Sequence, residues 1–223
     1  MKQVVTVKRR ALAANEEQAA KLRSRFAASG TLVVNLISSP GSGKTTLLEA
    51  TVRSLEGELS CAVLEGDVAT ENDADRIRAL GVPAHQILTG GGCHLDARQV
   101  ETGLADGGLP EVDILFIENV GNLICPTTYD LGEDFKVVLL SVAEGDDKPV
   151  KYPAIFARAE VAVVTKSDLL PYVPFDLESV KEQIVSLNPQ GSIVVASSLK
   201  GDGVDQWLDL LRERLAAKRR QQG

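Results

Sequence analysis

The segment SPGSGKT at residues 39–45 constrains the fold of this chain more than any other feature. It follows an apolar, β-branched run at residues 31–37 and precedes a helix-forming stretch. A glycine-rich loop ending in Gly-Lys-Ser/Thr between a strand and a helix is the P-loop pattern for phosphate binding. Gly41 and Gly43 leave the backbone free to turn its N–H groups inward. The segment therefore predicts a strand–loop–helix unit that binds phosphate, with a glycine-rich surface turn as the alternative.

The side chains of this segment suit a nucleoside triphosphate bound to magnesium. The Lys44 ammonium would neutralise the β- and γ-phosphates, and the Thr45 hydroxyl would ligate Mg²⁺, a hard cation that prefers oxygen. We therefore expect the following residues to contact the nucleotide: Gly41, Ser42, Gly43, Lys44, Thr45 and Thr46.

Strands and helices are expected to alternate along nearly the whole chain. Apolar runs predict buried strands at residues 31–37, 60–66, 85–89, 112–119, 135–143, 161–168 and 192–198. Helix-forming stretches lie at residues 10–29, 45–56, 72–80, 96–106, 176–188 and 203–218. The alternation predicts an α/β fold of the P-loop NTPase type, a mostly parallel sheet with helices on both faces. We divide the chain into an N-terminal helical segment, residues 1–30, and a P-loop GTPase domain with the metal site, residues 31–223.

Composition excludes several classes of protein. Asp and Glu number 31 against 24 Lys and Arg, a formal charge of −7. Because binding to a phosphate backbone needs a basic face, no nucleic-acid partner is expected. The three cysteines fit free thiols better than a disulfide framework. We recognise neither a signal peptide nor a membrane span in the sequence, and so we expect a cytoplasmic protein.

Two acidic residues end apolar strands, where a phosphate-bound Mg²⁺ needs a carboxylate. Asp67 follows the run at 60–66, and Glu118 closes the apolar part of the run at 112–119. Ligands of parallel sheets lie beyond the carboxyl ends of the strands, so both are candidate magnesium ligands and candidate catalytic residues, as are Lys44 and Thr45. Gly121 would turn its N–H toward the γ-phosphate. The alternative is that either acid is a solvated strand end.

The turn TKSD at residues 165–168 indicates which base is bound. Its Asp168 carboxylate would accept hydrogen bonds from N1–H and N2–H of guanine, a pair that adenine lacks. The Lys166 stem would cover the face of the base. After the next strand, a backbone N–H at Ser198 or Leu199 would meet guanine O6. An ordinary polar turn is the alternative.

Two cysteines and a histidine form a candidate site for a softer metal. Cys93 and His94 are adjacent and follow three glycines, and Cys125 comes seven residues after Glu118. Thiolate and imidazole ligands suit Ni²⁺ or Zn²⁺ rather than Mg²⁺. Cys61 lies within an apolar strand and is interpreted as a core residue. From the residues alone, a reactive or merely buried thiol stays an alternative to a metal site.

Several segments together resemble the HypB family, the GTPases that incorporate nickel during maturation of nickel–iron hydrogenase. They are NLISSPGSGKTTLLEA, LEGDVATENDADRI, LTGGGCHLDA, LFIENVGNLICP, TKSDLLP and SSLKGDGVDQW, preceded by ALAANEEQAAKLR. The resemblance covers nearly the whole chain. GGCHLDA and ENVGNLICP are its most specific parts, since a generic GTPase has neither.

The resemblance implies a slow, GTP-hydrolysing metallochaperone of the nickel-GTPase, signal-recognition and MinD class. Its nucleotide state would be coupled to metal binding and dimerisation. The resemblance further implies that Cys93, His94 and Cys125 bind nickel or zinc near a dimer interface. The implied partners are a second copy of the chain, a HypA-type metallochaperone and the hydrogenase large-subunit precursor.

The sequence departs from the usual patterns and leaves rival functions open. Ser38 stands where the P-loop has its first glycine, and Thr165 replaces the Asn of the guanine pattern Asn-Lys-x-Asp. We see no N-terminal Cys-x-x-Cys motif or histidine-rich stretch, which some family members carry, and so expect only the metal site of the GTPase domain. The rivals are a metallocentre chaperone GTPase of the urease or cobalamin-enzyme type, a P-loop small-molecule kinase, and a nucleotide-regulated metal-binding module with negligible turnover.

Overall fold

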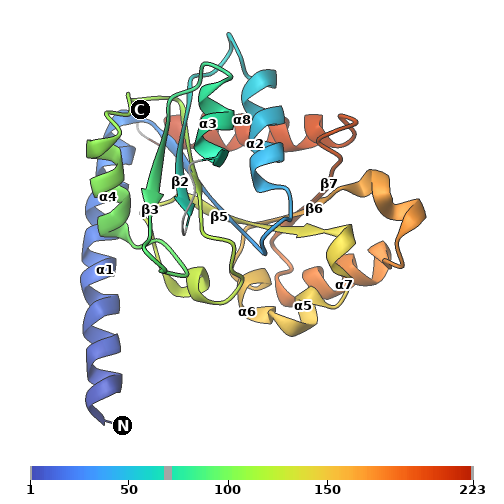
Figure 1. Cartoon of the computed structure of the whole chain (residues 1–223), viewed down its shortest axis with the longest axis horizontal. Coiled ribbons are helices and arrows are strands. Elements are labelled where there is room, and N and C mark those ends of the chain that lie inside the picture. Colours follow the sequence, from blue (N-terminus) through green and yellow to red (C-terminus); the bar gives the residue numbers. More distant parts are fainter. Residues whose placement is uncertain (1, 68–71, 222–223) are drawn as a thin grey trace.

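A computed structural model describes residues 2–67 and 72–221, with side chains from Arg10 onward. Within these ranges one parallel sheet of seven strands forms the centre of the molecule (Figure 1). Its strands are β1 (Leu32–Ser38), β2 (Cys61–Asp67), β3 (Ala84–Leu88), β4 (Ile114–Glu118), β5 (Phe135–Ser141), β6 (Val161–Thr165) and β7 (Ser192–Val195). Their order is β3-β2-β4-β1-β5-β6-β7, and every neighbouring pair is parallel. The predicted parallel sheet is confirmed.

The order of the strands determines where a ligand binds. β1 lies in the middle, with β4, β2 and β3 on one side and β5, β6 and β7 on the other. The connection that follows β1 runs to the β2 side of the sheet, and the connection that follows β4 runs to the β5 side. In such sheets ligands bind beyond the carboxyl ends of the strands, at the point where the connections diverge. The phosphate loop begins there.

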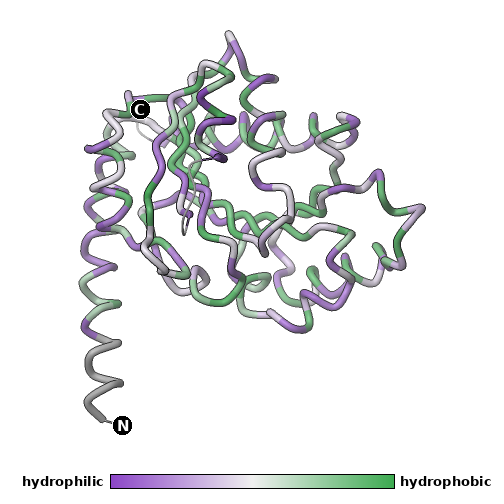
Figure 2. The backbone as a smooth tube through the Cα atoms, viewed as in Figure 1, coloured by the Kyte–Doolittle hydropathy of each residue, from purple (hydrophilic) through white to green (hydrophobic). Residues whose placement is uncertain are grey.

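Helices cover both faces of the sheet, as predicted. They are α1 (Lys2–Ser29), α2 (Lys44–Ser54), α3 (Asn72–Arg78), α4 (Ala97–Asp106), α5 (Lys148–Lys151), α6 (Pro153–Phe156), α7 (Leu177–Leu187) and α8 (Val204–Arg220), with 3₁₀ segments η1 (Cys125–Thr128), η2 (Val142–Glu144) and η3 (Ser167–Tyr172). Every residue of β1 is buried, which explains its near-continuous apolar sequence. The strands are coloured mainly as apolar, whereas the helices alternate between polar and apolar residues (Figure 2).

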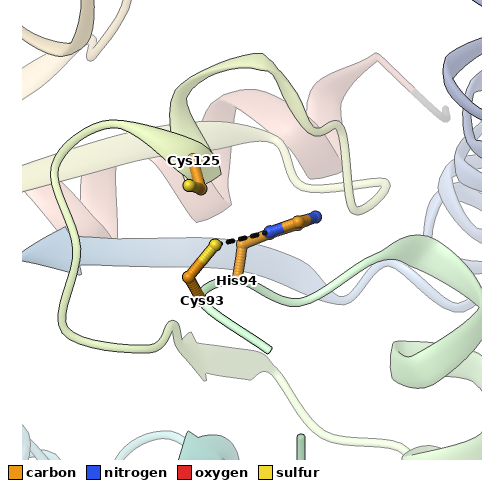
Figure 3. Close-up of side chains that lie close together, drawn as sticks. All are labelled: Cys93, His94 and Cys125. Atoms are coloured by element: carbon orange, nitrogen blue, oxygen red, sulfur yellow. Dashed lines mark hydrogen bonds between the residues drawn. The ribbon is translucent and has the colours of Figure 1, made fainter. Parts of the chain in front are cut away.

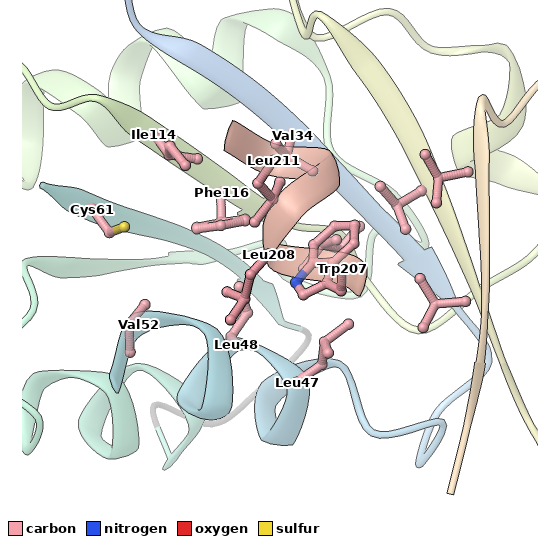
Figure 4. Close-up of a cluster of buried hydrophobic side chains, with 14 of the residues drawn as sticks. Val34, Leu47, Leu48, Val52, Cys61, Ile114, Phe116, Trp207, Leu208 and Leu211 are labelled. Carbon is pink, nitrogen blue, oxygen red and sulfur yellow. The ribbon is translucent and has the colours of Figure 1, made fainter. Parts of the chain in front are cut away.

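The core on one face joins α2 and α8 to the sheet (Figure 4). Trp207 and Leu208 of α8 belong to the same apolar cluster as Leu47 and Leu48 of α2. The fully buried Trp207 indole donates a hydrogen bond to Oγ1 of Thr51 at 2.9 Å, so its polar N–H is satisfied inside the core. The C-terminal helix thereby fixes α2 and the phosphate loop that precedes it.

Several element ends differ from the predicted ranges. β5 ends at Ser141, because the Ser141 hydroxyl accepts a hydrogen bond from the Ala143 backbone N–H at 3.2 Å and starts the η2 turn. β6 ends at Thr165 and β7 at Val195, both before the polar turns. α1 begins at Lys2, upstream of the predicted range. In the part of the chain that the structure describes, no helix combines the length and hydropathy needed to cross a membrane.

Candidate nucleotide and metal site

The phosphate loop, residues 39–43, joins β1 to α2. Gly41 and Gly43 have φ values of +76° and +90°, a region in which a side chain is strained, so glycine is needed at both positions. Gly43 directly precedes the first turn of α2, whose backbone N–H groups have no partner within the helix. The loop therefore presents backbone donors at a helix N-terminus, an arrangement that suits phosphate.

Lys44 and Thr45 are buried although both are polar. Nζ of Lys44 donates to Oγ of Ser38 at 2.9 Å and lies 3.7 Å from Oε1 of Glu118. Oγ1 of Thr45 lies within hydrogen-bond distance of both carboxylate oxygens of Glu118, at 3.2 and 3.3 Å. Ser38, where the usual pattern has glycine, therefore supplies an acceptor that orients Lys44.

A polar cavity of about 430 Å³ lies at the carboxyl ends of the central strands. Its lining includes most of the predicted nucleotide and magnesium residues: Gly41, Gly43, Lys44, Thr45, Thr46, Asp67, Glu118, Gly121 and Lys166. Gly121 lies against the phosphate loop so closely that a Cβ there would come 2.9 Å from Cγ of Pro40. A side chain at position 121 would push the two loops apart, so glycine permits their approach.

Sequence reasoning missed a carboxyl group that lines the same cavity. Glu65 is buried on β2 and lies opposite Glu118 in the β2–β4 register. Its Oε1 has no hydrogen-bond partner among the described residues. Burial raises the pKa of Glu65, and the nearby Glu118 charge raises it further. The sequence signal was an acidic residue inside an apolar strand.

The carboxyl groups fit a divalent cation. Burial also raises the pKa of Glu118, whereas the ammonium of Lys44 lowers it. Four acidic and three basic side chains line the cavity, and the buried Oε1 of Glu65 has no hydrogen-bond partner among the described residues. Carboxylate and hydroxyl oxygens are the ligands that Mg²⁺ prefers, so the residues present suit the predicted magnesium site.

The predicted base-recognition turn is tied to the phosphate loop. Nζ of Lys166 donates to the carbonyl oxygen of Gly41 at 2.8 Å. Oγ1 of Thr165 donates to the carbonyl oxygen of Ser42 at 2.6 Å. Thr165 stands where the guanine pattern has Asn, and the hydrogen bond of its hydroxyl keeps the turn attached to the phosphate loop.

Asp168, Ser198 and Leu199 lie outside the described lining of the phosphate cavity. Oδ1 of Asp168 accepts a hydrogen bond from Oγ of Ser197 at 2.6 Å, which joins the turn after β6 to the turn after β7. Ser198 is half-buried, and the side chain of Leu199 is exposed. The two turns predicted to contact the base are therefore adjacent.

The predicted soft-metal residues come together from two loops. The ligand atoms of Cys93, His94 and Cys125 all lie within 4.8 Å of one another. Sγ of Cys93 lies 3.5 Å from Nδ1 of His94, and the three side chains converge (Figure 3). Cys93 is exposed and the other two are half-buried, so an ion would reach the site from solvent. Two sulfurs and one nitrogen suit Ni²⁺ or Zn²⁺.

The pKa values of Cys93 and His94 are shifted in opposite directions. The hydrogen bond between Cys93 and Cys125, together with burial, raises the pKa of Cys93. Burial lowers the pKa of His94, which favours the neutral imidazole that binds metals. The ring of His94 lies against that of Tyr129, with centroids 3.9 Å apart.

Asn122, which sequence reasoning missed, ties the two metal loops together. Its Nδ2 donates to the carbonyl oxygen of Cys93 at 3.2 Å. Its Oδ1 accepts hydrogen bonds from the backbone N–H of Ile124 at 2.8 Å and of Cys125 at 3.4 Å. A single amide thus holds the backbone of one cysteine beside that of the other, a role typical of residues surrounding a metal site.

A second amide, which is buried, connects the metal loop to the phosphate cavity. Asn119 directly follows Glu118 and is 1% exposed. Its Oδ1 accepts from the backbone N–H of Leu95, the residue after His94, at 3.1 Å, and from that of Val120 at 3.0 Å. Its Nδ2 donates to Oδ1 of Asn35 on β1 at 3.3 Å. The loop that approaches the phosphates and the loop that carries His94 therefore share one hydrogen-bonded side chain.

Comparisons with known proteins agree with this geometry. A family model described as the nucleotide-binding domain of CobW, HypB and UreG matches residues 32–195. The hydrogenase maturation factor HypB of Escherichia coli K12 is 51% identical over 203 residues, which cover 91% of this chain and 70% of the relative. The chain belongs to the HypB family. The hydrogenase/urease maturation factor HypB of Helicobacter pylori 26695 is 41% identical to this HypB-family chain over 217 residues, covering 96% of the chain and 89% of the relative.

Solved HypB structures share the fold of this HypB-family chain. The crystal structure of Helicobacter pylori HypB in complex with nickel matches with a TM-score of 0.86 at 42% identity, covering 92% of this chain and 96% of that one. HypB from Archaeoglobus fulgidus matches with a TM-score of 0.85 at 40% identity, covering 91% and 99%. The signal recognition particle receptor FtsY from Elizabethkingia anophelis has a TM-score of 0.53 at 14% identity, covering 81% of this chain and 66% of that one, which extends the likeness of fold to P-loop nucleotide-binding proteins.

Proposed function

We propose that this chain is a GTP-hydrolysing metallochaperone that delivers nickel during hydrogenase maturation. The observation that carries the proposal is that Asn119, which lines the phosphate cavity, bonds the loop of His94, a member of the Cys93, His94 and Cys125 cluster. Cys125 lies on the segment that leaves Glu118, and His94 lies on the loop held by Asn119. A change at the phosphates therefore has a direct path to metal ligands from both loops.

The proposed hydrolysis of GTP to GDP and phosphate relies on charge and positioning. Lys44 neutralises the phosphate oxygens, and the backbone N–H groups of the loop hold them in place. Thr45, Asp67 and Glu118 would hold Mg²⁺, which supplies further positive charge to the phosphates. Gly121 brings its loop close to the γ-phosphate position, so loss of that phosphate would release a contact on this loop.

Nickel is the proposed cargo, with zinc as the competing ion. All three ligands come from one subunit, so water or a partner subunit would complete the shell. We further propose a homodimer, a HypA-type metallochaperone and a hydrogenase large-subunit precursor as partners, and the cytoplasm as the compartment. The division into a helical segment, residues 1–30, and a GTPase domain belongs to the same proposal.

The proposed guanine specificity predicts a large effect at Asp168. Replacing Asp168 with alanine removes a carboxylate that would accept two hydrogen bonds from guanine, so we expect GTP affinity to fall about 100-fold and the preference over ATP to disappear. Competition between labelled GTP and unlabelled ATP measures both. The control is Glu178→Ala, which removes an exposed acid on α7. Unchanged discrimination in Asp168→Ala would support the rival kinase or another base-binding mode.

Nickel titration tests the coupling between nucleotide and metal. We expect nickel affinity to differ about tenfold between GDP and a non-hydrolysable GTP analogue, in the range typical of coupled sites. In Asn119→Ala the difference should shrink, because the hydrogen bond to the Leu95 backbone is lost. Asn188→Ala is a matched control, since that amide bonds to the Ala159 carbonyl and neither residue lines the cavity.

Three results would separate the proposal from its rivals. Equal nickel affinity with GDP and the GTP analogue would contradict the coupling. Phosphate release that stays negligible with and without metal would favour a nucleotide-regulated metal-binding module. Faster turnover of ATP with a small-molecule acceptor would favour a kinase. A chaperone GTPase of the UreG or CobW type is not favoured, because the specific motifs at Cys93 and Cys125 belong to the HypB pattern.

A further inference from the structure

α1 contacts both loops that carry the proposed metal ligands. Asn15 is 6% exposed and makes two hydrogen bonds of 2.8 Å. Its Oδ1 accepts from the backbone N–H of Ala97, three residues after His94. Its Nδ2 donates to the carbonyl oxygen of Asp130, on the segment that follows Cys125. One side chain of the N-terminal helix thus bridges two loops that are distant in the sequence.

The Asp130 segment is attached to α1 by two further contacts. Arg23 donates to both carboxylate oxygens of Asp130 at 2.6 Å. Gly132 has a φ of +82° and packs so tightly that a Cβ there would lie 2.7 Å from Cβ of Leu22. The position of the segment after Cys125 therefore depends on the position of α1.

The other loop is attached to α1 through the apolar core. Ala19, Leu22 and Phe26 of α1 belong to one cluster with Leu95 and Ala97. The Ala97 backbone N–H belongs to the first turn of α4 and has no partner within that helix, so Asn15 satisfies a donor that burial would otherwise leave unpaired.

Asn15 also marks the place where α1 leaves the body of the protein. From residue 10 to residue 14 the side chains are exposed, apart from a half-buried Leu12. Figure 1 shows α1 running beside α4 and then projecting beyond it. Among the side chains described, Asn15 is the first buried one along the chain.

We propose that α1 braces the metal site and that Asn15 is the positioning residue that sets the separation of its two loops. The proposal rests on the metal site of the proposed function. A ligand set is productive only when its donors are held at coordination distance, and outer residues that hold them typically change metal affinity when they are replaced. Both hydrogen bonds of Asn15 go to backbone atoms of residues other than the proposed ligands, so it acts through the backbone of both loops.

The test compares nickel binding by the full chain and by Asn15 variants. We expect Asn15→Ala to weaken nickel binding about tenfold and to alter the thiolate-to-nickel charge-transfer absorption. Asn15→Asp keeps an acceptor for Ala97 and loses the donor to Asp130, so it should weaken binding as well. Arg23→Gln, a milder change in case Asn15→Ala does not fold, should weaken it about twofold.

Phe26→Leu is the matched control, because it loosens the apolar packing of α1 and removes no side-chain hydrogen bond or ion pair to either loop. Its thermal midpoint should fall, while its nickel affinity and spectrum stay as in the wild type. If Asn15→Ala and Arg23→Gln bind nickel with wild-type affinity and spectrum, or if Phe26→Leu weakens it equally, the brace is overturned. If the wild type itself binds no nickel through its cysteines, the proposed function fails, whatever the Asn15 variants do.

Discussion

Replacing Lys44 with alanine is expected to lower GTP turnover by at least about 100-fold, the scale seen when one stabilising donor is removed from a transition state. The Nζ atom lies beneath the phosphate loop, between the Ser38 hydroxyl and the Glu118 carboxylate. Without it, Glu118 faces the phosphates with no lysine to offset its charge. Phosphate release at saturating GTP and Mg²⁺, with nucleotide affinity from equilibrium binding, measures the loss.

Lys181→Ala is the matched control for this variant. Lys181 lies on α7 and pairs with the exposed Glu178, so its loss removes the same charge from the surface. Its turnover should equal that of the wild type. Near-normal turnover in Lys44→Ala would show that the cavity at the end of β1 is not where GTP is hydrolysed.

Replacing Cys93 with alanine is expected to lower nickel affinity by at least about 100-fold, since replacement of residues outside the ligand shell alone costs 10–100-fold. The variant leaves His94 and Cys125 with one sulfur and one nitrogen, too few to hold a soft metal strongly. Cys125→Ala should behave alike. Titration against a chromogenic chelator measures the affinity, and absorption of the nickel–thiolate bond reports the ligands.

Cys61→Ala is the control that keeps both proposed ligands. This remaining cysteine is buried in β2, where burial raises the pKa of its thiol to about 12. Its loss should leave nickel stoichiometry and absorption unchanged. If Cys61→Ala removes nickel binding and Cys93→Ala retains it, the cluster at the ends of the two loops is not the nickel site.

Local patterns in the sequence predicted the fold well. The P-loop motif and the apolar strands specified a parallel sheet, because buried strands and their crossovers leave a repeated pattern in the sequence. Asp96, the first residue of the predicted helix at 96–106, is the N-cap of α4, and its carboxylate accepts a hydrogen bond from the Gln99 backbone N–H at 2.8 Å. The ends of β5, β6 and β7 were less predictable, because polar turn residues decided them.

The candidate site was predictable only residue by residue. Cys93, His94 and Cys125 were chosen from their chemistry and from the family resemblance, and their roles stay predictions. Glu65 was not chosen, because an acidic residue inside a strand gives no sign of whether it faces solvent or a cavity. Asn122 was not chosen either, because polar residues in loops usually face water.

By itself the sequence predicted the phosphate loop, the alternation of strands and helices, and most of the side chains proposed to bind magnesium and a softer metal. These depend on residue type and short spacing. Only the tertiary structure brought Cys125 to Cys93 and placed Asn15 and Asn119 between distant loops. Such contacts depend on the strand order, with β4 inserted between β1 and β2, and on packing of α1 against α4. That arrangement is decided by the burial of apolar side chains over the whole core. No short segment of the sequence contains enough information to specify it.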